Sequence, residues 1–174
     1  FGTYLQKTMR NILIIGAGRS ASSLIQYLLN KSEAENLHLT IGDLSLELAQ
    51  RKTNNHKNAT AIAFDIFDET QRNIEIRKAD IVISMLPAHM HIEVAKDCIR
   101  YKKHMVTASY VSDAMQALDA QVKENNLVFM NEIGLDPGID HMSAMKIIDE
   151  IRDQGGKVIL FESFCGGLVA PESD

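Results

Sequence analysis

The sequence predicts a doubly wound α/β fold, in which helices cover both faces of a parallel sheet. Short, continuously apolar segments alternate with amphipathic ones along the 174 residues, as in parallel strands that are buried on both faces. A glycine-rich turn, Gly16-Ala17-Gly18, directly follows the first apolar segment. Polar residues such as Asp43 and Ser84 follow later apolar segments, at the sheet edge where ligands bind in such folds.

The expected strands and helices alternate regularly along the chain. Continuous apolar runs predict strands at 11–15, 37–41, 60–64, 81–84, 104–107 and 127–130. The amphipathic segments between them predict helices at 20–29, 45–51, 69–77, 89–100 and 113–125. We expect right-handed crossovers between the strands, as in nearly all parallel sheets.

The segment after this alternation predicts the start of a second unit. A long helix is expected at 138–154, with Met142, Met145, Ile148 and Ile151 on one face and glycines at its end. A strand is expected at 157–164. The predicted organisation is a flexible lead-in over 1–9, a dinucleotide-binding domain over 10–137, and a connecting helix with the truncated start of a second α/β domain, for the substrate, over 138–174.

Composition and charge argue against several classes of protein. The net charge of −5 disfavours a nucleic-acid partner, since phosphate binding needs clustered Lys and Arg. No apolar run approaches the ~20 residues that a membrane-spanning helix needs, so we expect no membrane association. The two cysteines, Cys98 and Cys165, are too few for a disulfide scaffold, which indicates a reducing cytoplasm.

The turn after the first strand matches the dinucleotide-binding fingerprint of the Rossmann fold. Its first glycine permits a tight turn, its second lets the backbone approach a pyrophosphate, and the alanine permits close packing of helix on strand. The phosphates are expected at the N-terminus of the next helix. A glycine turn without a ligand is the alternative, but a strand before it and a helix after it favour a nucleotide site. The expected cofactor contacts are Gly16, Gly18, Arg19, Ser20 and Ala21.

Asp43 ends the second expected strand. A carboxylate there can bind both ribose hydroxyls of NAD and would repel the 2′-phosphate of NADP. We therefore expect NAD, with NADP as an alternative because Arg19 or Arg51 could reach a 2′-phosphate. Asp43 could instead cap the helix that begins near Ser45, although Ser45 could equally be that cap.

Further cofactor contacts are expected after the third and fourth strands. Asp65 either borders the adenine pocket or serves only as a turn residue. Ser84, Leu86 and Pro87 should line the ribose and nicotinamide, because ligands in such sheets bind outside the carboxyl ends of the strands.

His89, His91 and Glu93 have the residue types of a metal site. If Pro87 begins the helix, the two histidines point about 200° apart and cannot share one ion. The sequence also contains no CxxC or HExxH spacing. We therefore expect no metal, and His89 could instead approach the cofactor.

Three more stretches are expected at the same sheet edge, namely 106–111, 134–138 and 163–168. Each contains one chemically capable residue that also has a plainer interpretation. Asp136 is a natural N-cap if Pro137 takes the first helical position. Tyr110 could be a half-buried packing residue, and Cys165 could be a small buried hydrophobe.

Taken together, four segments resemble the saccharopine dehydrogenase family of the glutamate-forming type, also called saccharopine reductase. In the family's order and spacing they are ISMLPAHMH, KKHMVTASYVSDAM, NEIGLDPGIDHM and SFCGGLVAPES. The resemblance covers about residues 10–174. It implies an oxidoreductase of lysine metabolism that reduces the imine of glutamate and 2-aminoadipate 6-semialdehyde to saccharopine with a nicotinamide cofactor, or runs the reverse reaction.

The resemblance also implies roles for single residues. Asp136 would orient or protonate the reacting nitrogen, and Tyr110 would hydrogen-bond it. Cys165 matches a third catalytic position. The implied substrate-binding residues are Ser109, Tyr110, Asp136, Gly138, Cys165 and Gly166.

The sequence departs from the family in two respects. Family members are more than twice as long, so we expect this portion alone to be inactive and a homodimer to form through the missing domain. Fungal relatives mostly favour NADP, whereas Asp43 favours NAD. Two other interpretations stay open: a carboxynorspermidine-type dehydrogenase acting on a polyamine precursor, and a nucleotide-binding module without catalysis that senses NAD.

Overall fold

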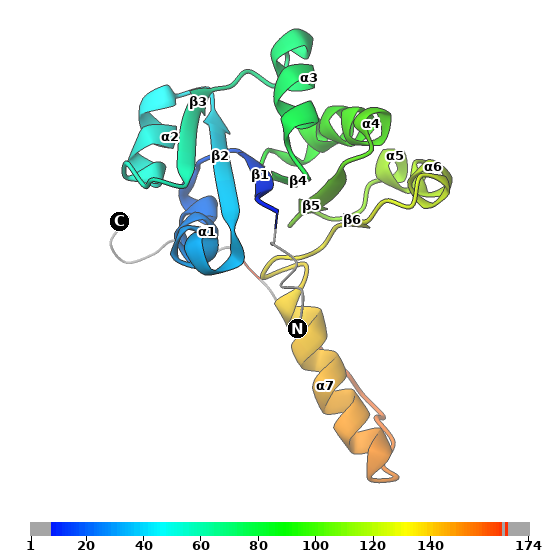
Figure 1. Ribbon diagram of the computed structural model, residues 1–174. Helices are drawn as coiled ribbons and strands as arrows, with labels where there is room; N and C mark the ends of the chain where they lie inside the picture. The colour runs from blue at the N-terminus through cyan, green and yellow to red at the C-terminus, as the bar shows by residue number, and fades with distance from the viewer. Residues whose placement is uncertain (1–7, 165, 167–174) are drawn as a thin grey trace, which may run out of the picture.

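The computed structural model describes residues 8–164 and 166, and within them a six-stranded parallel sheet has the order β3-β2-β1-β4-β5-β6 (Figure 1). The strands are β1 (Arg10–Ile15), β2 (Leu37–Asp43), β3 (Ala59–Ala63), β4 (Ile81–Ser84), β5 (His104–Thr107) and β6 (Phe129–Met130). The chain winds outward from β1 to β3 and then returns to place β4 on the other side of β1. This is the strand order of the Rossmann fold, so the predicted doubly wound fold is confirmed.

Helices cover both faces of the sheet because the strand side chains alternate between two cores. On one face, α1 (Ser22–Glu35) and α2 (Leu46–Thr53) pack on a cluster that contains Ile12 and Ile14 of β1. On the other, α3 (Glu69–Lys78), α4 (His91–Tyr101) and α5 (Asp113–Gln116) pack on a cluster that contains Leu13 and Ile15. The central strand β1 is therefore apolar on both faces, as its continuous apolar run predicts.

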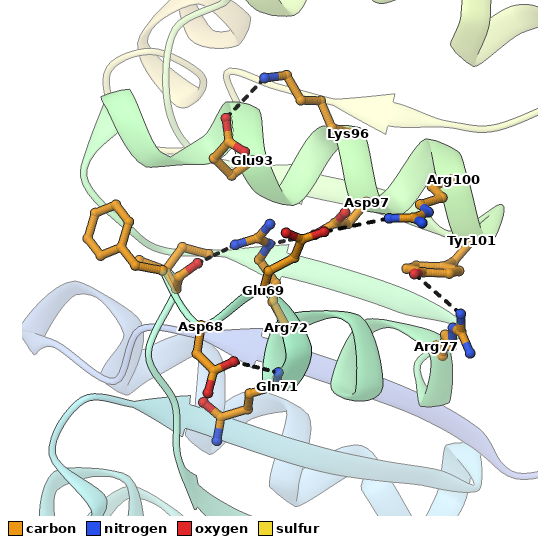
Figure 2. A network of polar contacts seen from close by, with 12 residues as sticks. Asp68, Glu69, Gln71, Arg72, Arg77, Glu93, Lys96, Asp97, Arg100 and Tyr101 are labelled. Atoms are coloured by element: carbon orange, nitrogen blue, oxygen red, sulfur yellow. Dashed lines mark hydrogen bonds and ion pairs between the residues drawn. The ribbon is translucent and has the colours of Figure 1, made fainter.

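A buried ion pair joins α3 to α4 (Figure 2). Arg72 donates from Nε to Asp97 Oδ2 at 2.5 Å, and its Nη1 donates to the carbonyl oxygen of Ile66 at 2.5 Å. Both side chains are only 8% exposed. One guanidinium thus holds together two helices and the segment that leads into the first of them.

The predicted single helix over 113–125 is wrong, because the structure divides it into α5 and α6 (Asp119–Glu124). At the break, the Leu118 N–H donates to the carbonyl of Met115, three residues back rather than four. This tighter hydrogen bond interrupts the α-helical ladder. Neither glycine nor proline occurs at the break, so the residue types give no sign of it.

The last described helix, α7 (Ile139–Asp153), extends away from the sheet and its covering helices (Figure 1). No residue of α7 is buried. The strand predicted at 157–164 is wrong, since these residues form no strand and Ile159, Leu160 and Phe164 are exposed. A strand needs a hydrogen-bonded neighbour, and the described chain supplies none for this segment.

No helix in the described ranges combines the length and the apolar character that crossing a membrane requires. Most of the predicted lead-in, residues 1–7, lies outside the described residues. The domain boundaries at 10, 137 and 138 stay predictions.

Candidate active site

Two adjoining cavities open at the carboxyl ends of the strands. They lie near the point between β1 and β4 where the strand order of the sheet reverses. The smaller, about 190 Å³, lies between the ends of β1, β2 and β3 and the segment after β4. The larger, about 450 Å³, lies beside the ends of β4 and β5. Leu86 lines both cavities. The predicted site residues that line the larger cavity are Ser20, Ser84, Leu86, Ser109, Tyr110 and Asp136.

The glycine turn approaches the neighbouring strand closely. Gly16 has a φ of +103°, and a Cβ added there would lie 2.8 Å from the carbonyl oxygen of Met85. A side chain at this position would therefore strain the backbone and clash with the residue that directly follows β4. Gly18 has open space around it, and Ala21 is fully buried against the first core. These placements fit the predicted roles of the three residues in a tight turn, a close approach and helix packing.

The helix after this turn begins without a side-chain cap. Arg19–Ala21 form a short 3₁₀ turn (η1), and α1 follows with no capping hydrogen bond from a side chain. The first N–H groups of a helix need acceptors. A phosphate group can supply them, which is how helix N-termini bind nucleotides.

The Asp43 side chain connects the glycine turn to the end of β2 by a hydrogen bond. Its Oδ2 accepts a hydrogen bond from the Ala17 N–H at 2.8 Å, and its Oδ1 accepts one from the Ser45 N–H at 2.9 Å. The cap of α2 is Ser45, whose Oγ accepts from the Leu48 N–H. The alternative in which Asp43 caps α2 is therefore wrong. Asp43 instead fixes a negative charge beside the smaller cavity, which it lines.

Asp65 takes the plainer of its two predicted roles. Its Oδ1 accepts a hydrogen bond from the Phe67 N–H at 2.9 Å, as in a turn. The smaller cavity is lined in this region by Phe64, Ile66 and Phe67. An adenine contact by Asp65 stays a prediction without support from the cavity lining.

Pro87 and His89 differ in their relation to the cavities. Pro87 lines the smaller cavity, as expected of a residue near the cofactor. His89 is exposed and lines neither cavity, within a 3₁₀ turn, η2 (Ala88–Met90). Because this turn precedes α4, the α-helix begins at His91 and not at Pro87. No group of three or more metal-ligating side chains is found among the residues that the structure describes.

His91 is the buried member of the pair of histidines and was not predicted as a site residue. It is 3% exposed, at the first position of α4. Its Nδ1 lies 2.8 Å from Ser84 Oγ, and its Nε2 lies 2.7 Å from Ser109 Oγ and 3.3 Å from Thr107 Oγ1. Burial lowers the pKa of His91, with His89 adding a smaller effect in the same direction.

Tyr110 and Asp136 meet across the mouth of the larger cavity. The Tyr110 hydroxyl donates to Asp136 Oδ1 at 2.6 Å. The two residues are far apart in sequence, and the loops after β5 and β6 bring them together. Asp136 does not cap a helix, because α7 begins at Ile139 with Gly138 as its N-cap. The predicted N-cap role of Asp136 and the first helical position of Pro137 are therefore wrong, and the Asp136-Pro137 peptide bond is cis.

Glu132 links these two loops by hydrogen bonds. It, too, was not predicted from the sequence as a site residue. Its backbone N–H donates to the Ser109 carbonyl at 3.0 Å, and its Oε1 accepts from the Val111 N–H at 3.1 Å. Tyr110 lies between these two contacts. Nearby, a hydrogen bond to Asp140 raises the pKa of His141, and the charges of Asp136 and Glu132 add to this effect. The edge of the site is thus negatively charged.

Of the remaining predicted residues, Gly138 and Gly166 take no part in these contacts. Gly138 is buried, and its N–H donates to Asp140 Oδ1 at 2.8 Å. Gly166 is exposed with open space around it, and Cys165 lies outside the described residues. Cys98 is a free thiol buried in the core, where burial raises its pKa. Substrate roles for Gly138, Cys165 and Gly166 stay predictions.

Two family models match the chain. The saccharopine dehydrogenase NADP-binding domain matches residues 12–130, and the saccharopine dehydrogenase C-terminal domain matches residues 134–174. The first of these models alone covers more than half of the chain. The two matches meet between β6 and α7, in the loop that contains Glu132.

Curated relatives agree with these models. The chain is 41% identical over 164 residues to a saccharopine dehydrogenase [NADP(+), L-glutamate-forming] of Pyricularia oryzae, and 38% identical over 163 residues to the enzyme of that name from Saccharomyces cerevisiae. Each match covers 94% of this chain and 36% of the relative. It is also 36% identical to a mitochondrial alpha-aminoadipic semialdehyde synthase of Rattus norvegicus, over 95% of this chain and 18% of the relative.

A solved structure shows the same relationship. The apo, L-Glu-forming saccharopine dehydrogenase of Saccharomyces cerevisiae superposes with a TM-score of 0.76 and 35% identity, over 84% of this chain and 32% of that chain. The chain thus spans about a third of the length of the fungal relatives that it matches. The sequence motifs, the fold and the family models agree, and this chain belongs to the saccharopine dehydrogenase family.

Proposed function

We propose that this chain is the nucleotide-binding part of an oxidoreductase that interconverts saccharopine with glutamate and 2-aminoadipate 6-semialdehyde. One observation carries the proposal beyond family membership. The hydrogen-bonded Tyr110–Asp136 pair borders the same cavity as Ser20, which lies in the 3₁₀ turn directly after the glycine turn. This shared cavity supports a role for the Asp136 carboxylate in handling a proton beside the nicotinamide.

The residues present fit a dinucleotide. Gly16 turns tightly against the Met85 backbone, Gly18 has open space around it, α1 has no side-chain cap, and the two cavities adjoin at Leu86. The smaller cavity is mostly apolar and suits the adenosine end, with Asp43 at its edge. The larger suits the nicotinamide end and the amino-acid substrate. When bound, the nicotinamide supplies or accepts the hydride.

Asp136 and Tyr110 supply the proton handling. In the oxidative direction, the secondary amine of saccharopine must lose a proton and a hydride to become an imine, which water then hydrolyses to glutamate and the semialdehyde. Asp136 is placed to accept the proton or to orient the nitrogen. The Tyr110 hydroxyl holds the carboxylate in position at 2.6 Å. A positioned acid or base contributes about 10²–10⁴-fold to the rate.

Turnover by the complete protein tests the proposal. The complete wild-type protein should reduce a nicotinamide cofactor when given saccharopine, and Asp136→Asn should lower kcat about 10²–10⁴-fold while nucleotide affinity is retained. Asn keeps an acceptor for the Tyr110 hydroxyl but cannot take a proton. Turnover of carboxynorspermidine in place of saccharopine would contradict the proposal that saccharopine is the substrate. Nucleotide binding without turnover of either amine would leave only a nucleotide-binding module.

We further propose that NAD is the preferred cofactor, although the matching domain model and the fungal relatives carry NADP in their names. The proposal is supported by the Asp43 carboxylate, which two backbone N–H groups hold at the edge of the smaller cavity. A 2′-phosphate at the adenosine ribose would lie near this charge and be repelled.

Asp43→Asn removes the charge and keeps one of the two acceptor oxygens. The amide oxygen can still accept from the Ala17 N–H, so the glycine turn should stay in place, while the hydrogen bond from the Ser45 N–H is lost. The ratio of kcat/KM with NADP⁺ to kcat/KM with NAD⁺ should rise about tenfold, as for one repulsive charge near the surface. An unchanged ratio, or a wild-type protein that already prefers NADP⁺, would contradict the proposed preference.

A homodimer and a cytoplasmic location also remain expectations. A small amino-acid substrate follows from the proposed reaction. The rat relative carries the word mitochondrial in its name.

A further inference from the structure

The imidazole of His91 is enclosed by hydroxyl groups from three consecutive parts of the sheet edge. Ser84 lies at the end of β4, Thr107 at the end of β5, and Ser109 in the loop that follows β5. Both ring nitrogens have hydroxyl partners, with Ser84 Oγ at 2.8 Å from Nδ1 and Ser109 Oγ at 2.7 Å from Nε2. The ring itself is not part of the cavity lining, whereas these hydroxyl-bearing residues are.

A neutral imidazole makes the hydrogen bonds on its two sides depend on each other. One ring nitrogen carries the proton and donates, and the other can only accept. His91 is nearly inaccessible to water, and burial lowers its pKa, so the ring is neutral near pH 7. If Ser84 donates to Nδ1, then Nε2–H donates to Ser109 Oγ. The hydrogen of the Ser109 hydroxyl is then free to point into the cavity.

Thr107 supplies a second hydroxyl oxygen on the Nε2 side of the ring. The Ser109 N–H donates to Thr107 Oγ1 at 3.3 Å, and this oxygen also lies 3.3 Å from His91 Nε2. In the arrangement in which Ser84 donates to Nδ1, the proton on Nε2 faces two hydroxyl oxygens, of which Ser109 Oγ is the nearer. Ser109 is only half-buried, in contrast to Ser84 and Thr107. It is the member of the group whose hydroxyl a ligand can reach.

We propose that His91 is a positioning residue that makes the Ser109 hydroxyl a hydrogen-bond donor to a carboxylate of the amino-acid substrate. The chain of hydrogen bonds runs from the Ser84 hydroxyl to Nδ1, from Nε2–H to Ser109 Oγ, and from the Ser109 hydroxyl to the substrate. The inference rests on the proposed function, because saccharopine carries the carboxylates that such a donor would bind. His91 touches neither substrate nor cofactor and acts through Ser109.

Steady-state kinetics of the complete protein test this role. His91→Phe keeps a ring but removes both nitrogens, and it should raise the KM for saccharopine about tenfold with less than about a twofold change in kcat. His91→Gln should stay within about twofold of wild type, because its amide N–H can replace Nε2–H. Ser109→Ala should raise KM about as much as His91→Phe. The double variant should be no worse than Ser109→Ala alone, because both changes remove the same contact.

The outcomes separate this role from a merely structural one. A KM effect of His91→Phe that persists fully in the Ser109→Ala background would overturn the proposal, as would an unchanged KM in a folded His91→Phe protein. If His91→Phe does not fold, His91→Asn replaces it, since its shorter amide cannot reach Ser109 and should raise KM while His91→Gln does not. Wild-type protein that turns over no saccharopine would end both proposals. If the wild type turns over saccharopine but the variants do not show the expected changes in KM, only the proposal about His91 is contradicted.

Discussion

The protonation of His91 is coupled to folding, because its pKa in the folded chain lies below the ordinary value of 6.5. Burial is the main cause, and the neighbouring His89 adds to it. Between the lowered folded pKa and 6.5, the unfolded chain therefore binds more protons than the folded one. The free energy of unfolding must rise with pH in this window and fall as the pH drops below 6.5.

We therefore predict an acid-sensitive contribution to stability that belongs to this one side chain. Between about pH 5.5 and pH 7.5, the free energy of unfolding of the wild-type chain should rise by up to about 1.4 kcal/mol because of His91. This upper limit is the linkage value for one pH unit below the ordinary pKa. His91→Gln should lose that gain, as measured by urea unfolding at the two pH values. An equal pH dependence in wild type and His91→Gln would contradict the assignment.

His141 provides a control of opposite sign. Its pKa is raised, chiefly by its hydrogen bond to Asp140, so its contribution is present below the unfolded pKa and is lost as the pH rises through the raised value. Removing it with His141→Gln should make stability rise more steeply with pH than in wild type. The two histidine variants should thus change the pH dependence in opposite directions.

Single residues were predictable from the sequence where the backbone itself imposes the requirement. The glycine at 16 and the alanine at 21 follow from a turn between a strand and a helix, and Asp43 follows from the end of the next strand. His91 and Glu132 act through tertiary contacts. His91 is the first residue of α4 because a 3₁₀ turn precedes the helix, which begins two residues later than expected, and no local pattern showed that delay. Glu132 matters only because the loops after β5 and β6 lie side by side.

At the scale of elements, the Arg72–Asp97 pair is the strongest polar connection between α3 and α4 in the described chain. Both charges are withdrawn from water, and Arg72 also binds the Ile66 carbonyl. Around the pair, exposed contacts join the same two helices, including Arg100 with Glu69 and Arg77 with the ring of Tyr101 (Figure 2). Exposed pairs of this kind contribute little because water and salt screen them.

We predict that Asp97→Ala lowers the free energy of unfolding by about 3–5 kcal/mol, because it leaves the Arg72 guanidinium buried and unpaired. The double variant Arg72→Met with Asp97→Leu should recover most of that loss, since it leaves no unpaired charge. Glu69→Gln, which affects only the exposed pair with Arg100, should change stability little. Chemical denaturation of the three variants measures these differences. A double variant as unstable as Asp97→Ala would show that the helices need the polar contact itself.

Elements were predictable where their signals are local. The strands β1 to β5 and the helices between them are predicted by apolar runs, amphipathic periods and the turn-forming residues between them, and the structure shows all of them. The break between α5 and α6 has no glycine or proline to mark it. The helix expected at 138–154 begins at Ile139, and Asp136 contacts Tyr110 rather than capping that helix. The apolar segment 157–164 reads as a strand but forms none without a neighbouring strand.

At the scale of the whole molecule, the fold concentrates its functional groups at one edge and leaves α7 outside the core. Met142, Met145 and Ile147 of α7 are 57%, 46% and 58% exposed. A long helix with so much exposed apolar surface is unusual in a stable globular protein. The model of the family's C-terminal domain matches residues 134–174, which include this helix. We therefore expect α7 to be packed in the complete protein by residues of that domain.

This expectation predicts that one substitution has different effects in two contexts. Met145→Ala should leave the free energy of unfolding of the 174-residue chain nearly unchanged, because the side chain makes no core contact there and alanine favours a helix. In the complete protein, the same substitution should cost about 2–5 kcal/mol if the side chain is buried. Lys146→Ala, next to it on the helix and also exposed, should be nearly neutral in both. Equal, small effects of Met145→Ala in the two proteins would show that this side of α7 stays exposed to solvent.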